Sequence, residues 1–197
     1  MKKNLSRIYK ILSVLLGYPG EDYLSQIKEI EVIAADMPPD EFKNSINEFI
    51  AYIRTRSMIR LREIYTDAFD VSPATTMNLT YHIWGDNEKR AGMLTRLQQV
   101  YQDAGYERIS GELPDYLPML LEFLSACPED TDVKLIWECF QHFDTYIDRL
   151  KQMSPAHAAL LQPLADTAVK YIQSKEFSPR QHAAELPGKL NRPYQEL

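Results

Sequence analysis

Apolar side chains recur every three or four residues along most of this chain, the spacing that places them on one face of an α-helix. Pro and Gly are concentrated between these stretches, where they end helices or form turns. In the first half, the pattern predicts four helices, which cover residues 4–16, a segment between Gly20 and Pro38, residues 40–53 and residues 57–69.

The second half continues the helical pattern with more interruptions. The prediction is a short helix over 75–84 ended by Gly85, a helix capped by Asp86 or Asn87 that runs to Ala104, a loop over 106–115, and helices over 116–126, 128–150 and 155–174. Residues 175–197 contain three prolines and a glycine, which predicts a flexible tail. The sequence therefore predicts an all-α, compact single-domain bundle of about eight or nine helices over residues 1–174.

Composition narrows the class of protein. Only 7 of 197 residues are Gly, too few for the many tight turns of an all-β fold. The net charge is −6 and the basic residues are dispersed, which argues against a nucleic-acid-binding surface. No apolar run approaches the length of a membrane span, and Arg7 and Lys10 interrupt the N-terminal apolar stretch, unlike in a secretion signal. We expect a cytoplasmic protein.

The residues that commonly carry catalysis do not form a recognisable constellation. None of the four histidines lies in a metalloprotease or nucleophile motif, and the two cysteines lack CxxC spacing. His82 and Asp86 are four residues apart, but Gly85 between them is expected to break the helix that a shared metal would need. Asp115 and Glu122 lack a partner nucleophile. We expect no enzymatic activity, no metal and no cofactor.

Polar and aromatic residues gather between positions 65 and 123, and they are the candidate binding residues. Taken singly, an aromatic residue at helical spacing belongs more often to the core, and an Asp at a helix end is often only a cap. Taken together, they predict a groove lined by Tyr65, Phe69, Tyr81, Trp84, Leu117 and Leu121, with Asp70, Asp86, Asp115 and Glu122 near its rim.

Four segments in this region carry a family resemblance: YTDAFD, NLTYHIWGDNEKRAGML, YQDAGYE and ELPDYLPMLLEF, in that order. Together with the N-terminal LLGYP, they make the chain similar to the nitrate reductase delta-subunit chaperones, the NarJ branch of the NarJ/TorD/DmsD group. The resemblance covers residues 8 to about 126. It implies a TorD-like all-α fold and places the family's loop motif on residues 113–118, which adds Pro114, Tyr116 and Pro118 to the candidate site. Arg90, which belongs to the same polar block, is also a candidate. Many relatives carry His where this chain has Tyr116.

The resemblance also implies a function. Such proteins bind the N-terminal peptide of a molybdoenzyme catalytic subunit, here most simply the nitrate reductase alpha subunit, and assist molybdenum cofactor insertion before membrane attachment. A leader of this kind suits helix-in-groove recognition, and an acidic rim suits a basic peptide. The tail over 178–197 is a candidate occupant of the empty groove.

Two alternatives remain open from the sequence. The client enzyme is not specified, so a chaperone for another enzyme of the dimethyl sulfoxide reductase family fits the same residues. A helical regulatory domain that holds a small ligand in its pocket belongs to a different class, and retention of a small molecule without peptide affinity would favour it.

Overall fold

The computed structural model describes residues 2–106 and 111–174 of the chain. Within these residues the secondary structure is helical, apart from one isolated antiparallel bridge between Asn78 and Tyr116. The elements are α1 (Lys2–Leu15), α2 (Tyr23–Ala35), α3 (Glu41–Arg54), α4 (Met58–Tyr65), the π-helical turn η1 (Thr66–Asp70), the 3-10 turn η2 (Pro73–Thr75), α5 (Tyr81–Trp84), α6 (Glu88–Asp103), α7 (Leu117–Ala126), α8 (Lys134–Glu138), α9 (Phe143–Met153) and α10 (Pro155–Gln173). The all-α prediction is confirmed, whereas the predicted tail over 175–197 lies outside the described residues.

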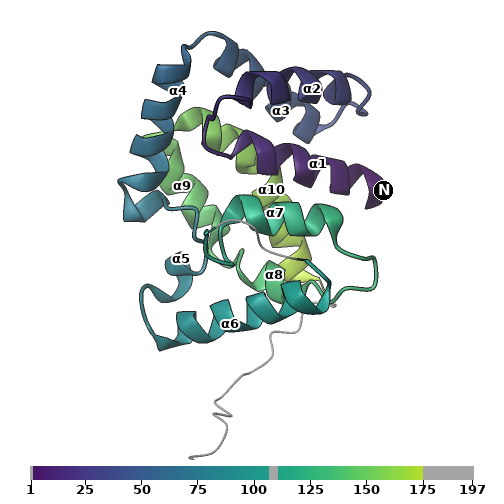
Figure 1. Cartoon of the computed structure of the whole chain (residues 1–197), viewed down its shortest axis with the longest axis vertical. Coiled ribbons are helices and arrows are strands. Elements are labelled where there is room, and N and C mark those ends of the chain that lie inside the picture. Colours follow the sequence, from purple (N-terminus) through teal and green to yellow (C-terminus); the bar gives the residue numbers. More distant parts are fainter. Residues whose placement is uncertain (1, 107–110, 175–197) are drawn as a thin grey trace, which may run out of the picture.

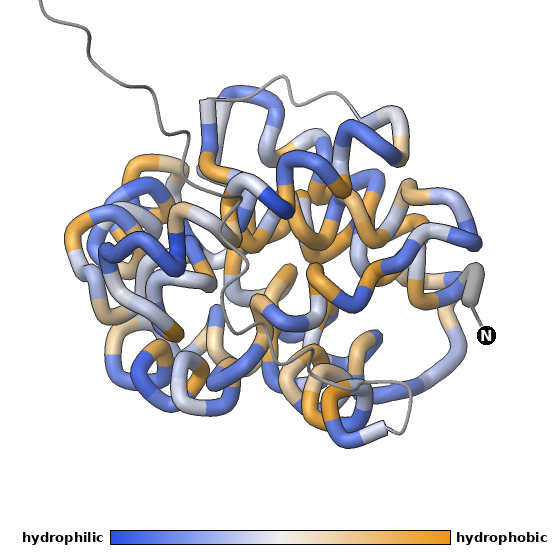
Figure 2. Tube along the Cα trace, turned by 90° about the horizontal axis from the view of Figure 1, so that it is seen from below, coloured by the Kyte–Doolittle hydropathy of each residue, from blue (hydrophilic) through white to orange (hydrophobic). Residues whose placement is uncertain are grey.

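The helices are arranged around a central group. Helix α1 packs along α7, and α10 packs against both α3 and α9. Figure 1 shows α2 and α3 at one end of the molecule, α5 and α6 at the other, and α1 and α7 between them. In Figure 2, many of the hydrophobic positions lie near the middle of the molecule, where the helices meet. The side chains at this centre are almost completely buried, among them Leu12, Leu16, Leu120, Phe123, Leu160 and Leu164.

Helix α7 is apolar on nearly every side. Its sequence, LPMLLEFLSA, has a single charged residue, and six of its ten residues are buried. A helix with this composition belongs in the core rather than at the surface. Pro118 fits because it lies in the first turn, where its missing N–H has no helical partner to lose. The helix therefore begins at Leu117 without the irregularity that an interior proline causes.

Side-chain caps start three of the helices. The side-chain oxygens of Asp40, Ser57 and Asn87 each accept a hydrogen bond from a backbone N–H in the first turn of the adjoining helix. Of the two caps proposed for the helix after Gly85, Asn87 is thus the one in place. Gly85 itself has a φ of 64°, the left-handed conformation that ends α5 at low cost for glycine.

Two predicted helices were wrong in extent. The helix expected over 128–150 is divided into α8 and α9, with His142 at a φ of 64° between them. Histidine is one of the few residue types besides glycine that adopt a positive φ with some frequency. The break therefore needs neither Gly nor Pro, and the sequence does not mark it. The helix expected over 75–84 is reduced to α5, because the residues before it form η2 and an extended bridge.

A buried histidine makes the stability of this fold depend on pH. His157 lies in α10 beside the rings of Phe49 and Phe69, and its Nδ1 pairs with the Ser154 hydroxyl at 2.7 Å. Burial lowers the pKa of His157 from 6.5 to about 3. The unfolded chain therefore takes up a proton on this side chain as the pH falls through 6.5, while the folded chain does not.

We predict that this one group reduces the free energy of unfolding by about 2 kcal/mol between pH 7 and pH 5. Urea unfolding at both pH values, compared between the unaltered protein and His157→Phe, measures how much of the pH-dependent loss in the free energy of unfolding comes from His157. His142→Asn, at an exposed position, is the matched control and should keep the full pH dependence. An equal loss in the His157→Phe protein would contradict the assignment.

Candidate functional site

The site begins with a change of helical pitch after α4. The backbone N–H of Val71 donates to the carbonyl of Thr66 at 3.1 Å, a π-helical i to i+5 hydrogen bond. A π-turn inserts one extra residue and rotates the residues after it, and such turns are frequent at functional sites. Here Phe69 stays buried while Asp70 reaches the surface at the end of the turn.

A cleft with two lobes lies next to this π-turn. The first, which we call the tyrosine lobe, has a volume of about 300 Å³ and is lined by Tyr18, Tyr65, Phe69, Asp70, Thr76, Met77, Asn78, Glu112 and Tyr116. The second, the arginine lobe, has a volume of about 330 Å³ and is lined by Phe69, Asp70, Ser72, Pro73, Thr76, Asn78, Tyr81, Arg90 and Leu113. Phe69, Asp70, Thr76 and Asn78 line both lobes, so the two are adjacent, and we describe them together as the cleft.

Aromatic rings build the tyrosine lobe. The ring of Tyr65 meets those of Tyr18 and Phe69 edge to face, with centroids 5.3 and 5.1 Å apart. Tyr18 is 52% exposed, and the turn that carries it is fixed by Arg62, whose Nε donates to the Pro19 carbonyl at 2.8 Å. These ring contacts give the lobe a defined aromatic wall, which suits a preformed binding surface.

Two tyrosine hydroxyls meet in this lobe. The hydroxyls of Tyr65 and Tyr116 are 2.7 Å apart and share a hydrogen bond. Burial is the main cause that raises the pKa of each, and the charges of Asp70 and Glu112 raise both further. Both side chains are therefore neutral phenols at physiological pH, and each offers a donor and an acceptor.

The wall behind the cleft is held by Asp115. This carboxylate is 0% exposed, and its Oδ2 accepts hydrogen bonds from both the backbone N–H and the hydroxyl of Thr80. Arg90 places Nη2 3.5 Å from the same oxygen and donates from Nε to the Thr80 hydroxyl at 3.2 Å. The buried charge is thus paired, as a carboxylate at such depth requires.

Backbone hydrogen bonds reinforce this connection. The Leu79 N–H donates to the Asp115 carbonyl at 3.1 Å, and the Leu117 N–H donates to the Met77 carbonyl at 2.8 Å. These bonds frame the bridge between Asn78 and Tyr116. They join the segment before α5 to the start of α7, and so they close the cleft on its inner side.

His82 supports the same segment. Its Nε2 lies 2.8 Å from the Thr76 carbonyl, so this nitrogen carries the proton and donates. Burial is the largest influence on the pKa of His82 and lowers it, which keeps the ring neutral. The histidine serves the shape of the cleft wall, and the carboxylate of Asp86 is 94% exposed and paired with Arg90 instead.

The structure brings six of the predicted site residues to the cleft: Tyr65, Phe69, Asp70, Tyr81, Arg90 and Tyr116. The expectation that Leu117 and Leu121 line an open groove is wrong, because both are fully buried in α7. Pro114 and Pro118 are buried as well, and the Pro114 carbonyl accepts from the Tyr101 hydroxyl.

The predicted acidic rim also needs correction. Asp115 is fully buried behind the cleft, and Glu122 pairs with Lys10 across the α1–α7 contact. Neither Asp86 nor Trp84 lines either lobe. The acidic residues that do line the cleft are Asp70 and one that was not among the predicted site residues, Glu112.

Several lining residues were missed from the sequence. Tyr18 lies between Gly17 and Pro19, and an aromatic residue within a turn signal is a hint that was available. Thr76, Met77 and Asn78 were assigned to a helix, which concealed their part in the bridge. Their positions depend on contacts with residues 115–117, which are distant in sequence.

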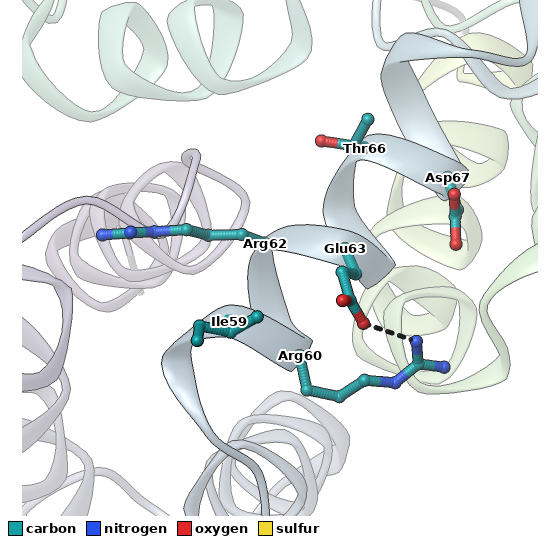
Figure 3. Close-up of a pocket in the computed structure, with 6 residues that line it drawn as sticks. All are labelled: Ile59, Arg60, Arg62, Glu63, Thr66 and Asp67. Atoms are coloured by element: carbon teal, nitrogen blue, oxygen red, sulfur yellow. Dashed lines mark hydrogen bonds and ion pairs between the residues drawn. The ribbon is translucent and has the colours of Figure 1, made fainter.

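A wider depression lies on the outer side of α4. Its volume is about 640 Å³, and Ile59, Arg60, Arg62, Glu63, Thr66 and Asp67 line it. Figure 3 shows these side chains around one helix and its π-turn, with Arg60 paired to Glu63 at 3.0 Å and Arg62 extending toward the N-terminal helices. It contains no predicted site residue, and exposed ion pairs of this kind contribute little energy.

Comparison with known proteins places the chain in a family. A family model described as "Nitrate reductase delta subunit" matches residues 36–168. This chain belongs to the nitrate reductase delta subunit family. The match includes all of the cleft except Tyr18.

Similar proteins of known description support the assignment to the delta subunit family. This chain is 30% identical over 164 residues to the nitrate reductase molybdenum cofactor assembly chaperone NarJ of Escherichia coli, covering 81% of this chain and 70% of that protein. It is 26% identical over 156 residues to the probable chaperone of the same name from Bacillus subtilis, covering 79% and 85%. The E. coli protein NarW, described as a probable chaperone of this type, is 25% identical over 181 residues, covering 86% and 75%. All three relatives are described as nitrate reductase molybdenum cofactor assembly chaperones, two of them as probable ones.

Metal sites and membrane spans are not found in the described part of this delta-subunit-family protein. Among residues 2–106 and 111–174, no three His, Cys, Asp or Glu side chains are grouped so as to hold a metal ion. The same residues contain no helix long and apolar enough to cross a membrane.

Removing the Asp115 carboxylate should destabilise the fold. Asp115→Ala leaves the Thr80 N–H without its acceptor and removes the buried carboxylate that pairs with Arg90, which is only 11% exposed, so we predict a loss of about 3–5 kcal/mol in the free energy of unfolding. Urea denaturation measures it. Asp86→Ala removes the exposed partner of the same arginine and should change the midpoint little. Equal effects of the two substitutions would show that the buried pair has no special importance.

Proposed function

We propose that this protein is a cytoplasmic chaperone that binds the N-terminal peptide of a nitrate reductase catalytic subunit and assists molybdenum cofactor insertion before membrane attachment. The observation that carries the proposal is family membership over most of the chain, together with relatives named as nitrate reductase molybdenum cofactor assembly chaperones. The two-lobed cleft is the proposed peptide site. It is lined by turns and connecting segments that the helices of the bundle support, which suits a preformed recognition surface.

The cleft supports a particular mode of recognition. It is lined by phenol and amide groups, two carboxylates and one guanidinium, so hydrogen bonds and charge contribute to it as well as apolar contact. Because Leu117 and Leu121 are in the core, the cleft is not the long apolar groove that was expected to take one face of a helix. We propose instead that a short stretch of the peptide places separate side chains in the two lobes.

The chaperone performs no chemistry on its client in this proposal. Its contribution is to hold the N-terminal segment away from other partners while the catalytic subunit is still incomplete. A modest and reversible affinity serves that purpose, and a cleft of this size suits micromolar binding, which is about −8 kcal/mol. Release then needs no input beyond dilution or competition by the matured subunit.

The test is calorimetry of the full chain with a synthetic peptide that spans the first 30 or so residues of the nitrate reductase catalytic subunit from the same organism. We expect saturable binding at micromolar concentration, and Tyr81→Ala should weaken it about tenfold because its ring lines the arginine lobe. The absence of saturable heat at high micromolar peptide would count against the proposed function.

A matched control uses the other depression. Ile59→Ala removes an exposed apolar side chain from the surface shown in Figure 3, and peptide affinity should be unchanged. If Ile59→Ala weakens binding and Tyr81→Ala does not, the peptide site lies on α4 and the cleft assignment is wrong. Circular dichroism confirms that both variants are folded.

A further inference from the structure

The last part of the sequence differs in charge from the rest of the chain. Residues 1–174 contain 18 Lys and Arg against 25 Asp and Glu, whereas residues 175–197, which lie outside the described structure, contain four against three. Within them, residues 186–194, which we call the basic segment, include Lys189 and Arg192 and no Asp or Glu. A basic stretch is therefore joined covalently to a predominantly acidic body, which attracts it.

The composition of the basic segment complements that of the cleft. Besides its two cations, the segment has apolar residues at every fourth position: Leu186, Leu190 and Tyr194. The described residues of the tyrosine lobe include two acids, Asp70 and Glu112, and no Lys, Arg or His. Each acid is followed in sequence by an exposed apolar residue, Val71 at 70% and Leu113 at 40%. The two surfaces thus share a mixture of apolar and charged groups, with opposite signs of charge.

Helix α10 sets the distance that the chain has to cover. Its first turn lies beside the cleft, because the ring of His157 meets that of Phe69 with centroids 5.0 Å apart, and Phe69 lines both lobes. From there the helix continues to Gln173. At 1.5 Å per residue, its end is about 24 Å from that first turn. A segment that follows α10 must therefore retrace the length of the helix to reach the cleft.

This distance separates the basic residues after α10 into two groups. An extended chain spans at most about 3.5 Å per residue, so Arg180, six residues after Ser174, is limited to about 21 Å. Lys189 and Arg192 have limits of about 50 and 60 Å, roughly twice the length of the helix. The basic segment is thus within reach of the cleft, whereas Lys175 and Arg180 are not.

We propose that the basic segment folds back and occupies the cleft of its own chain, with Lys189 and Arg192 against the two acidic residues of the tyrosine lobe. Tethering gives such a segment an effective concentration in the millimolar range, so a weak contact is enough to cover the cleft. The segment is then an intramolecular competitor that only a tighter ligand displaces. Its role against a client rests on the proposed function, whereas the contact itself is a property of this chain alone.

The contact is tested first in the full chain without a client. A nitroxide spin label is attached to Gln195→Cys in a Cys127→Ser background. Cys139 escapes labelling because it is 1% exposed and burial raises the pKa of its thiol. In NMR spectra of tyrosine-labelled protein, we expect the spin label to broaden the ring signals of Tyr65 and Tyr116.

The position of the label and the origin of the contact have their own controls. The same label on Ser178→Cys lies too close to α10 to reach the cleft and should not broaden these signals. Adding an excess of unlabelled protein should leave the broadening unchanged. Absence of broadening from residue 195 overturns the proposal, and so does broadening that falls on mixing, because the segment then comes from a second copy.

Charge variants of the full chain provide matched pairs. Lys189→Gln with Arg192→Gln should largely remove the broadening, whereas Lys175→Gln with Arg180→Gln removes an equal charge outside the reach of the cleft and should preserve it. Within η1, Asp70→Asn should reduce the broadening and Asp67→Asn, which lines the outer depression, should not. Equal effects within either pair overturn the contact. Urea midpoints equal to that of the unaltered protein show that the variants are folded.

The client peptide gives the second measurement. Calorimetry should show about 5- to 20-fold tighter peptide binding to the Lys189→Gln, Arg192→Gln protein than to the unaltered one, because a larger fraction of the protein has an accessible cleft. Equal affinities overturn the competition while the proposed function stands. No peptide binding to either protein, with broadening that follows the charge variants, has the opposite meaning: the contact stands and the proposed function fails.

Discussion

The buried carboxylate of Asp115 is the interaction on which the site depends. It has no access to water, and it draws Thr80 and Arg90 onto one oxygen from a segment more than twenty residues earlier in the chain. A charge at this depth is tolerated only with such partners, so the loop before α7 and the segment around α5 have one favourable relative position. The backbone bonds around the Asn78–Tyr116 bridge then fix the spacing between them. The cleft is the surface that this joint leaves between η1 and residues 112–116.

Around that joint, buried residues support the cleft and more exposed residues supply its polar groups. The apolar α7 lies in the core beside α1, and it holds Tyr116 at its N-terminal end as a half-buried side chain. On the other side, the π-turn after α4 keeps Phe69 inside and brings Asp70 out. Adjacent residues of one segment thus serve packing and recognition separately.

Helical periodicity was enough to predict the class of fold and most helix positions, because the apolar stripes of α1, α2, α3 and α6 are set locally. It failed where the outcome depends on distant contacts or on unusual backbone geometry. The break at His142 has no Gly or Pro to mark it, and the π-turn at 66–70 has the composition of an ordinary helix. For the site, sequence found the phenols of Tyr65 and Tyr116 but misplaced Asp115, since an Asp before a helix has the same appearance whether it caps the helix or pairs with Arg90. The apolar composition of α7 did carry a signal that Leu117 and Leu121 are internal, and it was interpreted as a groove instead.

The shared wall of the cleft has a thermodynamic consequence. Phe69, Asp70, Thr76 and Asn78 face both lobes, so any adjustment of these side chains to an occupant of one lobe alters the space and charge offered by the other. Two side chains of one ligand would then bind with a coupling free energy, and that coupling is reciprocal. Discrimination between ligands thus comes from the pair of side chains and their separation along the bound segment, a more selective criterion than either contact provides separately.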